Sequence, residues 1–383
     1  MVLRGFFRVN FERLARTAAI AVAAIGVAVG GMPGGASAEH AAQPKSQATL
    51  VRDAVDQFIL PRIDTFKTRT HELAEAVAGV CQPAANPAAL EAAQRAFVET
   101  VRAWAPLDLI RFGPSARNHR LERVLFWPDP RATAERQLNA LLAARKPELL
   151  EPGALAAQSV AVQGLTALEA LLFDDKQPLG SADDEAARYR CGMAAAISSA
   201  IDTVAGEIRS GWAGDDGYRA KILNPGPGNR LYRDTAESAR EIAKALVTGF
   251  DLVRDRIALP ELLAISRTPP RRARLPFERS DATGVFVVAT VGALRDLYEA
   301  CAFEARVGAD KGWMTGFLTA GWNGLMVESE RLDRVRKGEV ASKDHLHVVR
   351  KLRFDITSIR QIVVRELAAN AGIIMGFNEL DGD

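Results

Sequence analysis

The sequence contains few cysteines and histidines, and this limits the kinds of site that it can build. Its 383 residues include three cysteines, Cys81, Cys191 and Cys301, and five histidines. Three cysteines are too few for a disulfide-dense scaffold or a multi-cysteine zinc site. The zinc-peptidase pattern His-Glu-x-x-His is absent, as are the Gly-x-Ser-x-Gly, P-loop and dinucleotide-binding glycine patterns. These absences argue against the common zinc peptidases, serine hydrolases and nucleotide-binding enzymes.

The chain also lacks an excess of charge of either sign. It has 49 Lys and Arg against 47 Asp and Glu, for a formal net charge of +2. Residues 1–38 hold four arginines and one glutamate, so the remainder has 45 basic and 46 acidic residues and a net charge of −1. A nearly neutral chain has no broad basic surface, and we expect no nucleic-acid partner.

The first 38 residues have the pattern of an export signal. Arginines at positions 4, 8, 13 and 16 precede an apolar stretch at 18–29 that is short for a membrane span. Ala36-Ser37-Ala38 follows as a small-x-small cleavage site. We predict a signal peptide over 1–38, a mature start at Glu39, and a location in the periplasm or cell envelope. No cysteine lies near the cleavage site, so no lipid anchor is expected, and no transmembrane segment remains after cleavage. The alternative is an uncleaved membrane anchor.

An exported chain enters an oxidising compartment, where cysteines can pair. Cys81 falls at the end of one expected helix and Cys191 at the start of another in the same half of the chain, whereas Cys301 lies alone in the other half. We therefore predict a Cys81–Cys191 disulfide. The alternative is three buried, reduced thiols.

Helical spacing of apolar residues dominates the chain, and no convincing period-two alternation occurs. The spacing predicts helices over 51–80, 90–104, 194–212, 242–257, 286–301, 317–335 and 346–367, with Ser181 capping the third and Pro260 ending the fourth. The fold class is therefore predicted to be all-α.

Turn-forming residues cluster at 215–230, where Asn224-Pro225-Gly226-Pro227-Gly228 stands out. We take this stretch as a linker between two up-and-down helical bundles, at 39–214 and 231–383. A second irregular stretch, 266–280, carries prolines and arginines and is expected to be a solvated loop.

One segment is apolar around most of its circumference. If residues 155–173 form one helix, four polar side chains fall within about 120° of one another, at Ser159, Gln163, Thr166 and Glu169. A buried carboxylate needs a partner, so Glu169 should meet an arginine, a metal ion or a proton of its own. The alternative is a structural Glu–Arg pair that fixes the bundle register.

A second segment with functional potential begins at Arg111-Phe112-Gly113-Pro114 and ends at Phe126-Trp127-Pro128-Asp129-Pro130. It reads as a rigid connection between helices, and such connections often carry function. Arg111 or Arg123 is a reasonable partner for Glu169. The candidate ligand-binding set is therefore Gln163, Thr166, Glu169, Arg111, Arg123 and Trp127. The alternative is a packed elbow with Trp127 in the core.

Several separate motifs resemble the imelysin-like family over nearly the whole mature chain. They are Arg111–Pro114, Phe126–Pro130, Gln163–Glu169, Leu275-Pro276-Phe277-Glu278-Arg279 and the C-terminal Gly376–Asp383. The resemblance implies an exported protein of two helical bundles, linked to iron uptake or metal binding. Founding members are described as metallopeptidases with a Gly-x-His-x-x-Glu metal motif.

In this chain that motif corresponds to Gly164–Glu169, and Thr166 stands in the histidine position. A hydroxyl is a poor ligand for zinc or iron beside an imidazole. Glu169 would need further ligands from other elements, and His119 and Asp129 are the candidates for a site holding iron or another divalent cation.

We therefore expect a non-catalytic, exported protein that binds a metal or a small ligand near Glu169 in connection with iron uptake. One alternative is an envelope scaffold that binds a protein partner, and another is a metallopeptidase.

Overall fold

A computed structural model describes residues 46–82, 87–180, 184–268, 273–303, 312–337, 342–368 and 373. All of them belong to one compact unit, 43–383. No β-strand occurs in these ranges, which confirms the predicted all-α class. The predicted signal peptide, the predicted cap Ser181 and the motif at 376–383 lie outside the described residues. No helix in the described ranges is both long and apolar enough to span a bilayer.

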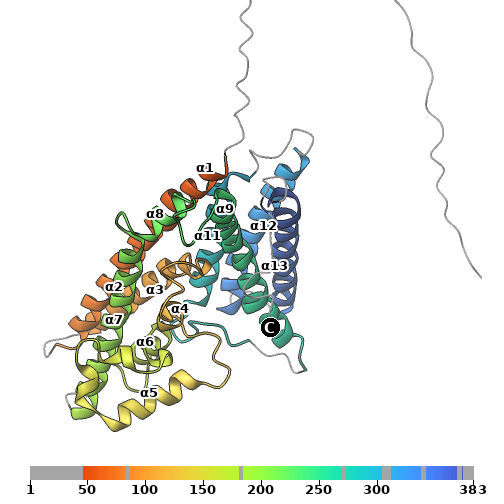
Figure 1. Cartoon of the computed structure of the whole chain (residues 1–383). Coiled ribbons are helices and arrows are strands. Elements are labelled where there is room, and N and C mark those ends of the chain that lie inside the picture. Colours follow the sequence, from red (N-terminus) through yellow and green to blue (C-terminus); the bar gives the residue numbers. More distant parts are fainter. Residues whose placement is uncertain are drawn as a thin grey trace, which may run out of the picture. The chain divides into compact units, whose positions relative to one another are not determined.

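The first half of the chain forms a bundle around α2, which packs against α3 and α7 (Figure 1). Its elements are α1 (Gln47–Asp53), the π-helix η1 (Ala54–Ile59), α2 (Leu60–Val80), α3 (Pro87–Trp104), the 3₁₀ turn η2 (Leu107–Leu109), α4 (Arg120–Val124), α5 (Thr133–Ala144), the 3₁₀ turns η3 (Pro147–Leu150), η4 (Ala154–Ala157) and η5 (Val160–Val162), α6 (Leu165–Leu172) and α7 (Glu185–Trp212). Asp184 caps α7, because its side chain accepts a hydrogen bond from the Ala187 amide at 2.7 Å.

The second half forms another bundle, in which α12 packs against α11 and α13, and α9 contacts α11 and α13 (Figure 1). Its elements are α8 (Tyr218–Leu223), α9 (Thr235–Asp251), the π-helix η6 (Leu252–Ala258), α10 (Leu259–Ile265), α11 (Thr283–Cys301), α12 (Trp313–Arg336), α13 (Ser342–Ile362) and the π-helix η9 (Val363–Ala368).

The two bundles share a hydrophobic core. Helix α1 packs against α9 and α11, and α11 also contacts α3 and η1. The buried apolar side chains of both halves accordingly form one connected cluster. The expected linker at 215–230 contains α8, which contacts α1, α7 and α9. Its role as a domain boundary remains a prediction.

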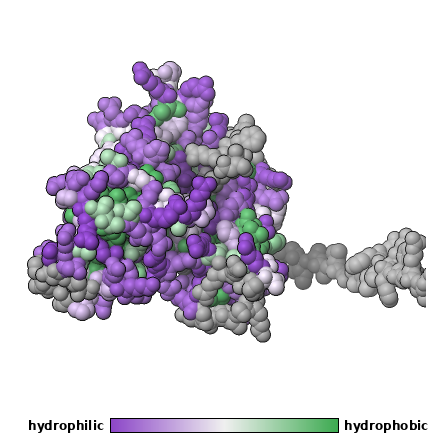
Figure 2. Space-filling model, turned by 90° about the horizontal axis from the view of Figure 1, so that it is seen from below, coloured by the Kyte–Doolittle hydropathy of each residue, from purple (hydrophilic) through white to green (hydrophobic). Residues whose placement is uncertain are grey.

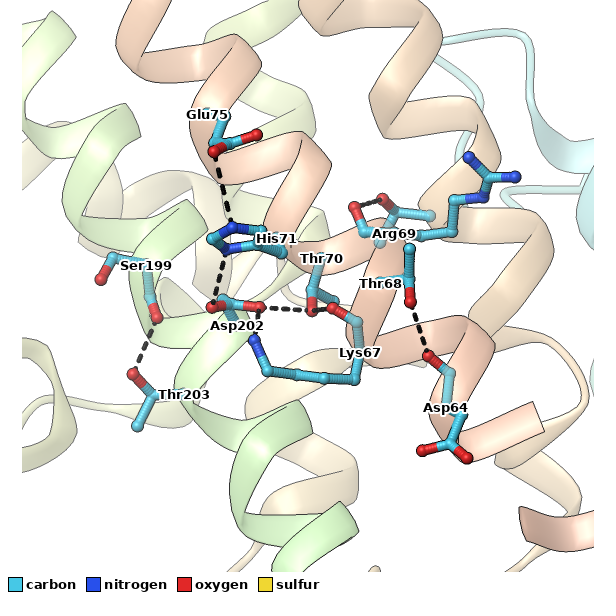
Figure 3. Close-up of polar contacts among 11 residues, drawn as sticks. Asp64, Lys67, Thr68, Arg69, Thr70, His71, Glu75, Ser199, Asp202 and Thr203 are labelled. Carbon is cyan, nitrogen blue, oxygen red and sulfur yellow. Dashed lines mark hydrogen bonds and ion pairs between the residues drawn. The ribbon is translucent and has the colours of Figure 1, made fainter. Parts of the chain in front are cut away.

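Polar contacts also join α2 to α7 within the first bundle (Figure 3). Asp202 on α7 accepts hydrogen bonds from Lys67 Nζ at 2.6 Å and Thr70 Oγ1 at 2.7 Å, both from α2. His71 Nδ1 lies 3.8 Å from the same carboxylate, but its side chain is 62% exposed. Because Lys67 neutralises Asp202, this cluster is an ion-pair network that ties two helices together.

Pro260 does not end its helix, as the sequence had suggested. The helix instead continues from α9 through η6 into α10, with Pro260 in the first turn of α10. The same arrangement occurs at Pro61, which follows η1 at the start of α2. A proline cannot donate the regular backbone hydrogen bond, and in both places a π-helical segment precedes it, so the prolines are accommodated without breaking the helix.

Cys81 and Cys191, the pair predicted from the sequence, form a disulfide between the end of α2 and α7, with Cα atoms 5.5 Å apart. Cys301 is buried on α11. The disulfide closes a loop of 110 residues within the first bundle. In the chain-entropy account a loop of this length restricts the unfolded chain strongly.

We predict that replacing Cys81 and Cys191 together by alanine lowers the free energy of unfolding by about 4–5 kcal/mol. Urea unfolding under oxidising conditions measures this. Cys301→Ala is the control, and it should keep its sensitivity to reductant while the double variant loses it. A double variant as stable as the oxidised wild type would contradict the expectation.

Candidate functional site

Glu169 lies on α6 and is only 6% exposed, so the carboxylate is buried as the sequence suggested. Its apolar helix neighbours Leu165, Leu168 and Leu172 are buried as well. The carboxylate must therefore find hydrogen-bond donors inside the protein, because leaving it unpaired would be costly.

The segment 155–173 is not the single helix that the sequence suggested. It consists of η4, η5 and the short α6, which begins only after Gly164. The Ser159 side chain accepts from the Ala161 amide and starts a new turn, and Gly164 has an extended backbone. The four polar residues therefore do not form one helical stripe, and that part of the prediction is wrong.

Gly164 is required by a close approach between two elements. A Cβ atom at this position would lie 2.4 Å from the Val124 carbonyl oxygen and 2.6 Å from that of Arg123. Only glycine allows the start of α6 to lie this close to the end of α4. The approach sets the position of α6, and with it that of Glu169.

The partner of Glu169 is Ser280, in the second half of the chain. Glu169 Oε1 accepts hydrogen bonds from the Ser280 amide at 3.0 Å and from the Ser280 hydroxyl at 2.7 Å. The charge of Arg279 and a backbone hydrogen bond from that residue add to this contact. Burial nevertheless raises the pKa of Glu169 above its ordinary value, and these donors offset only part of the effect.

A pocket of about 280 Å³ opens beside Glu169. The residues that line it come from both halves of the chain. They are Trp127, Asp129, Ala132, Ala134, Glu135, Leu138, Thr166, Ala167, Glu169, Ala170, Arg274, Leu275, Pro276, Phe277, Glu278 and Arg279. Arg279 pairs with Glu135 of α5 at 3.1 Å, and Glu278 pairs with Arg336 of α12. Of the predicted ligand-binding residues, Thr166, Glu169 and Trp127 line this pocket.

The arginines predicted to neutralise Glu169 bind other acceptors. Arg111 pairs with Asp108, three residues earlier. Arg123 donates through Nε to Gln163 Oε1 at 2.9 Å and lies 3.5 Å from Glu207 on α7. Gln163 is itself buried and donates to the Gln158 carbonyl at 2.6 Å. Gln163, Arg111 and Arg123 are not among the residues that line the pocket. Arg123 and Gln163 connect α4 to the segment before α6, and Arg111 is paired within the turn at η2.

The residues considered as metal ligands are not brought together. Both carboxylate oxygens of Asp129 accept backbone amides at the start of α5, from Thr133 and Ala134, at 2.8 Å each. Burial opposes ionisation of Asp129, but these amides hold its pKa below the ordinary value. His119 is exposed, at the N-terminus of α4, and does not line the pocket.

Thr166 donates its hydroxyl to the Phe126 carbonyl at 3.4 Å. Throughout the described ranges no three His, Cys, Asp or Glu side chains form a group that could hold a metal ion. The donor set around Glu169 therefore does not fit a bare metal ion, which needs at least three protein ligands in sites of this kind.

Sequence reasoning missed the segment that completes the site. Residues 266–280 were expected to be a solvated loop, yet Leu275, Pro276 and Phe277 are buried, and Ser280 holds Glu169. The apolar Leu275-Pro276-Phe277 sequence within the family-like motif was the signal that this loop packs inward.

The fold and this site define a helical protein of two bundles with a ligand-sized pocket beside a buried carboxylate. The sequence profile of the imelysin family matches residues 59–311, so the chain belongs to this family.

Two solved structures share the fold. An imelysin-like protein from Psychrobacter arcticum has a TM-score of 0.69 at 16% identity, covering 86% of this chain and 97% of that one. A protein described as an iron-regulated protein A precursor, from Parabacteroides distasonis, has a TM-score of 0.58 at 11% identity, covering 84% and 96%. A comparison with curated protein sequences finds no match.

The raised pKa of Glu169 predicts how stability varies with pH. Because the folded state holds the proton more tightly than the unfolded state, wild-type stability should fall as the pH rises from the ordinary value of 4.5 through the raised folded pKa. Glu169→Gln removes this titration and keeps an acceptor for Ser280. Urea unfolding at pH 4 and pH 7.5 should show that the variant gains stability relative to wild type at the higher pH. A difference that does not change with pH would contradict the assignment.

The close approach at Gly164 predicts a position-specific cost. Gly164→Ala forces α4 and α6 apart and should lower the free energy of unfolding by about 2 kcal/mol or more. Gly226→Ala is the matched control, because a Cβ there meets nothing within 4 Å. Its stability should change by less than about 1 kcal/mol. Equal costs for the two variants in thermal or urea unfolding would exclude this explanation of Gly164.

Proposed function

We propose that this chain is a non-catalytic protein of the periplasm or cell envelope that binds a small ligand in the pocket beside Glu169 and takes part in iron uptake. The supporting observation is the buried Glu169 carboxylate on the wall of a 280 Å³ pocket, reached by side chains from both bundles. Pockets of this size with a few convergent polar groups are typical of small-molecule sites.

The contacts at the site favour binding over catalysis. A metal-dependent peptidase needs a metal-bound water and a general base. Here Thr166 takes the place of the histidine in the family motif, and Glu169 accepts two hydrogen bonds from Ser280. Chelator-sensitive cleavage of casein by the purified protein would favour the metallopeptidase alternative instead.

The link to iron is supported by the family and by the fold shared with a protein described as iron-regulated. Because the donor set does not fit a bare ion, we propose that iron reaches this pocket inside a small-molecule complex rather than as a free cation. Export is supported by the arginine-rich, apolar and small-residue pattern of residues 1–38.

The alternative function is an envelope scaffold that binds a protein partner. Helix α12 favours it, because Trp313, Phe317 and Val327 lie on one face and are 65%, 45% and 51% exposed. The molecular face in Figure 2 is largely hydrophilic, with only small hydrophobic patches. A stoichiometric partner recovered from periplasmic extract, lost on Trp313→Ala and unaffected by Glu169→Ala, would favour the scaffold.

Calorimetric titration of the chain starting at Glu39 tests the ligand-binding proposal. We expect ferric citrate, used as a model iron complex, to bind with one-to-one stoichiometry, and Fe²⁺, Zn²⁺, Cu²⁺ and Ca²⁺ alone to bind weakly or not at all. Glu169→Ala should weaken binding of the complex about 10- to 100-fold, the usual effect of losing a charge-assisted contact.

Glu151→Ala is the control, since it removes an exposed carboxylate that does not line the pocket. It should bind like the wild type. Tight binding of a bare cation would show that the metal site exists after all, and absence of binding by both the complex and the cations would remove the ligand-binding function.

A further inference from the structure

A small cavity shares two lining residues with the Glu169 pocket, and an arginine that has no role in the site described above also lines it. Arg256, on the π-helix η6, lines this cavity together with Asp108, Leu125, Trp127, Pro276 and Phe286. The cavity volume is about 20 Å³, enough for one water-sized group. Most of its wall is apolar, so a polar group that enters it would be drawn to Arg256.

Arg256 is half-buried, and within the part of the chain that the structure describes it interacts with Asp108 and Glu122 through charge alone, without a hydrogen bond or a close ion pair. A guanidinium carries five N–H donors, accepts nothing and stays charged at any physiological pH. None of the Arg256 nitrogens is among the fully buried polar atoms that lack a partner in the described ranges, so solvent reaches the guanidinium and its donors remain open to an incoming acceptor. The more deeply buried Arg123 and Arg190 each donate to a protein acceptor.

The charges around Arg256 do not supply that acceptor. Asp108, which shares the cavity wall, is paired with Arg111. Glu122 is close enough to interact electrostatically, but it is exposed on α4. Burial and the nearby charge of Arg111 together lower the pKa of Arg256 below its ordinary value. The guanidinium groups of Arg111 and Arg256 thus lie near one another, and the Asp108 carboxylate is already paired with Arg111.

The cavity and the Glu169 pocket have a wall in common. Trp127 and Pro276 line both of them. Trp127 is only partly buried, and it lines both the larger pocket and the small cavity that Arg256 lines. A ligand that lies against Trp127 and Pro276 in the larger pocket is therefore next to the cavity that Arg256 lines.

We propose that Arg256 binds an anionic oxygen group, a carboxylate or a phosphate, carried by the ligand of the Glu169 pocket. This inference rests on the proposed function and names the chemical class of its ligand: a small oxyanion or an iron complex of one, with its neutral or donor portion near Glu169 and its anionic end at Arg256. The cavity has room for one water-sized group, so it admits one oxygen of such a terminal group, and the charged N–H donors of the guanidinium suit that oxygen.

The experiment measures binding of three probes to the chain starting at Glu39: citrate, ferric citrate and inorganic phosphate. Citrate or its iron complex should bind, and Arg256→Gln should weaken that binding at least tenfold, as expected for a lost charge-assisted hydrogen bond. Arg267→Gln makes the same change of charge at an exposed position outside both cavities and should bind like the wild type. Phosphate binding that depends equally on Arg256 would identify phosphate as the source of the anion.

The outcomes separate this inference from the proposed function. If Arg256→Gln binds as tightly as wild type while Glu169→Ala does not, the anion subsite is wrong and the Glu169 pocket stands. If Arg256→Gln loses binding and Glu169→Ala keeps it, the anion subsite stands and the function proposed for Glu169 fails. No binding of any probe to the wild type overturns the subsite.

The melting temperature of the Arg256 variants gives an independent test. Because Arg256 has no hydrogen bond or close ion pair in the described ranges, Arg256→Gln should melt at or above the wild-type temperature, and a large drop would show that the residue is structural. Should Arg256→Gln fail to fold, Arg256→Lys serves instead, since it retains the charge but loses the planar fork. Arg256→Lys should bind citrate more weakly than the wild type does but still measurably. Wild-type affinity in this variant would contradict a specific contact with the guanidinium.

Discussion

The Glu169 carboxylate is buried on a short helix whose own neighbours cannot satisfy it. The hydroxyl and amide that do so belong to Ser280, which is 111 residues further along the chain. Since an unsatisfied carboxylate in this position would be strongly destabilising, the position of α6 in the first bundle and the loop before α11 in the second depend on each other. The pocket therefore exists only when both halves are folded and in contact.

The loop that carries Ser280 is held at more than one point. Glu278 pairs with Arg336 of α12, and Arg279 pairs with Glu135 of α5. Arg336 also donates to the fully buried Glu261 at 2.8 Å. Burial opposes ionisation of Glu261, but hydrogen bonding from His345 and the charge of Arg336 hold its pKa below the ordinary value. A chain of charged contacts thus runs from α13 through α10 and α12 to the pocket wall, which fixes the loop although it contains little regular structure.

Apolar spacing was a reliable guide where a helix has one buried face and one exposed face. It located α2, α3, α7, α11, α12 and α13 because the stripe on each of these helices records burial directly. It failed over 155–173, where nearly every residue is apolar and no stripe distinguishes a helix from a series of turns. The break at Gly164 arises from contact with the carbonyl oxygens of α4, which is a tertiary constraint that local sequence does not contain.

The burial of Glu169 could be predicted from its apolar surroundings, but its partner could not. Arg111 and Arg123 were suggested because they lie in the irregular connection at 111–130 that was expected to carry function, and each has another acceptor, Asp108 for the first and Gln163 for the second. Hydrogen bonds across more than a hundred residues depend on how the bundles pack, and spacing alone does not determine this. The loop at 266–280 is rich in proline and arginine and was predicted to be solvated, because its buried segment Leu275–Phe277 is short.

The distribution of satisfied charges decides what kind of ligand suits the pocket. Each carboxylate on its wall is already engaged: Asp129 by backbone amides, Glu135 by Arg279, Glu169 by Ser280 and Glu278 by Arg336. Arg274 on the same wall has no hydrogen bond or ion pair within the described ranges, and neither has Arg256, which lines the neighbouring small cavity with Trp127. A bare cation could be coordinated only if existing contacts of these carboxylates were broken. An anion, in contrast, could accept hydrogen bonds from these arginines without breaking any contact. Under the proposed link to iron, this favours recognition through the oxyanion that carries the metal rather than through the metal itself.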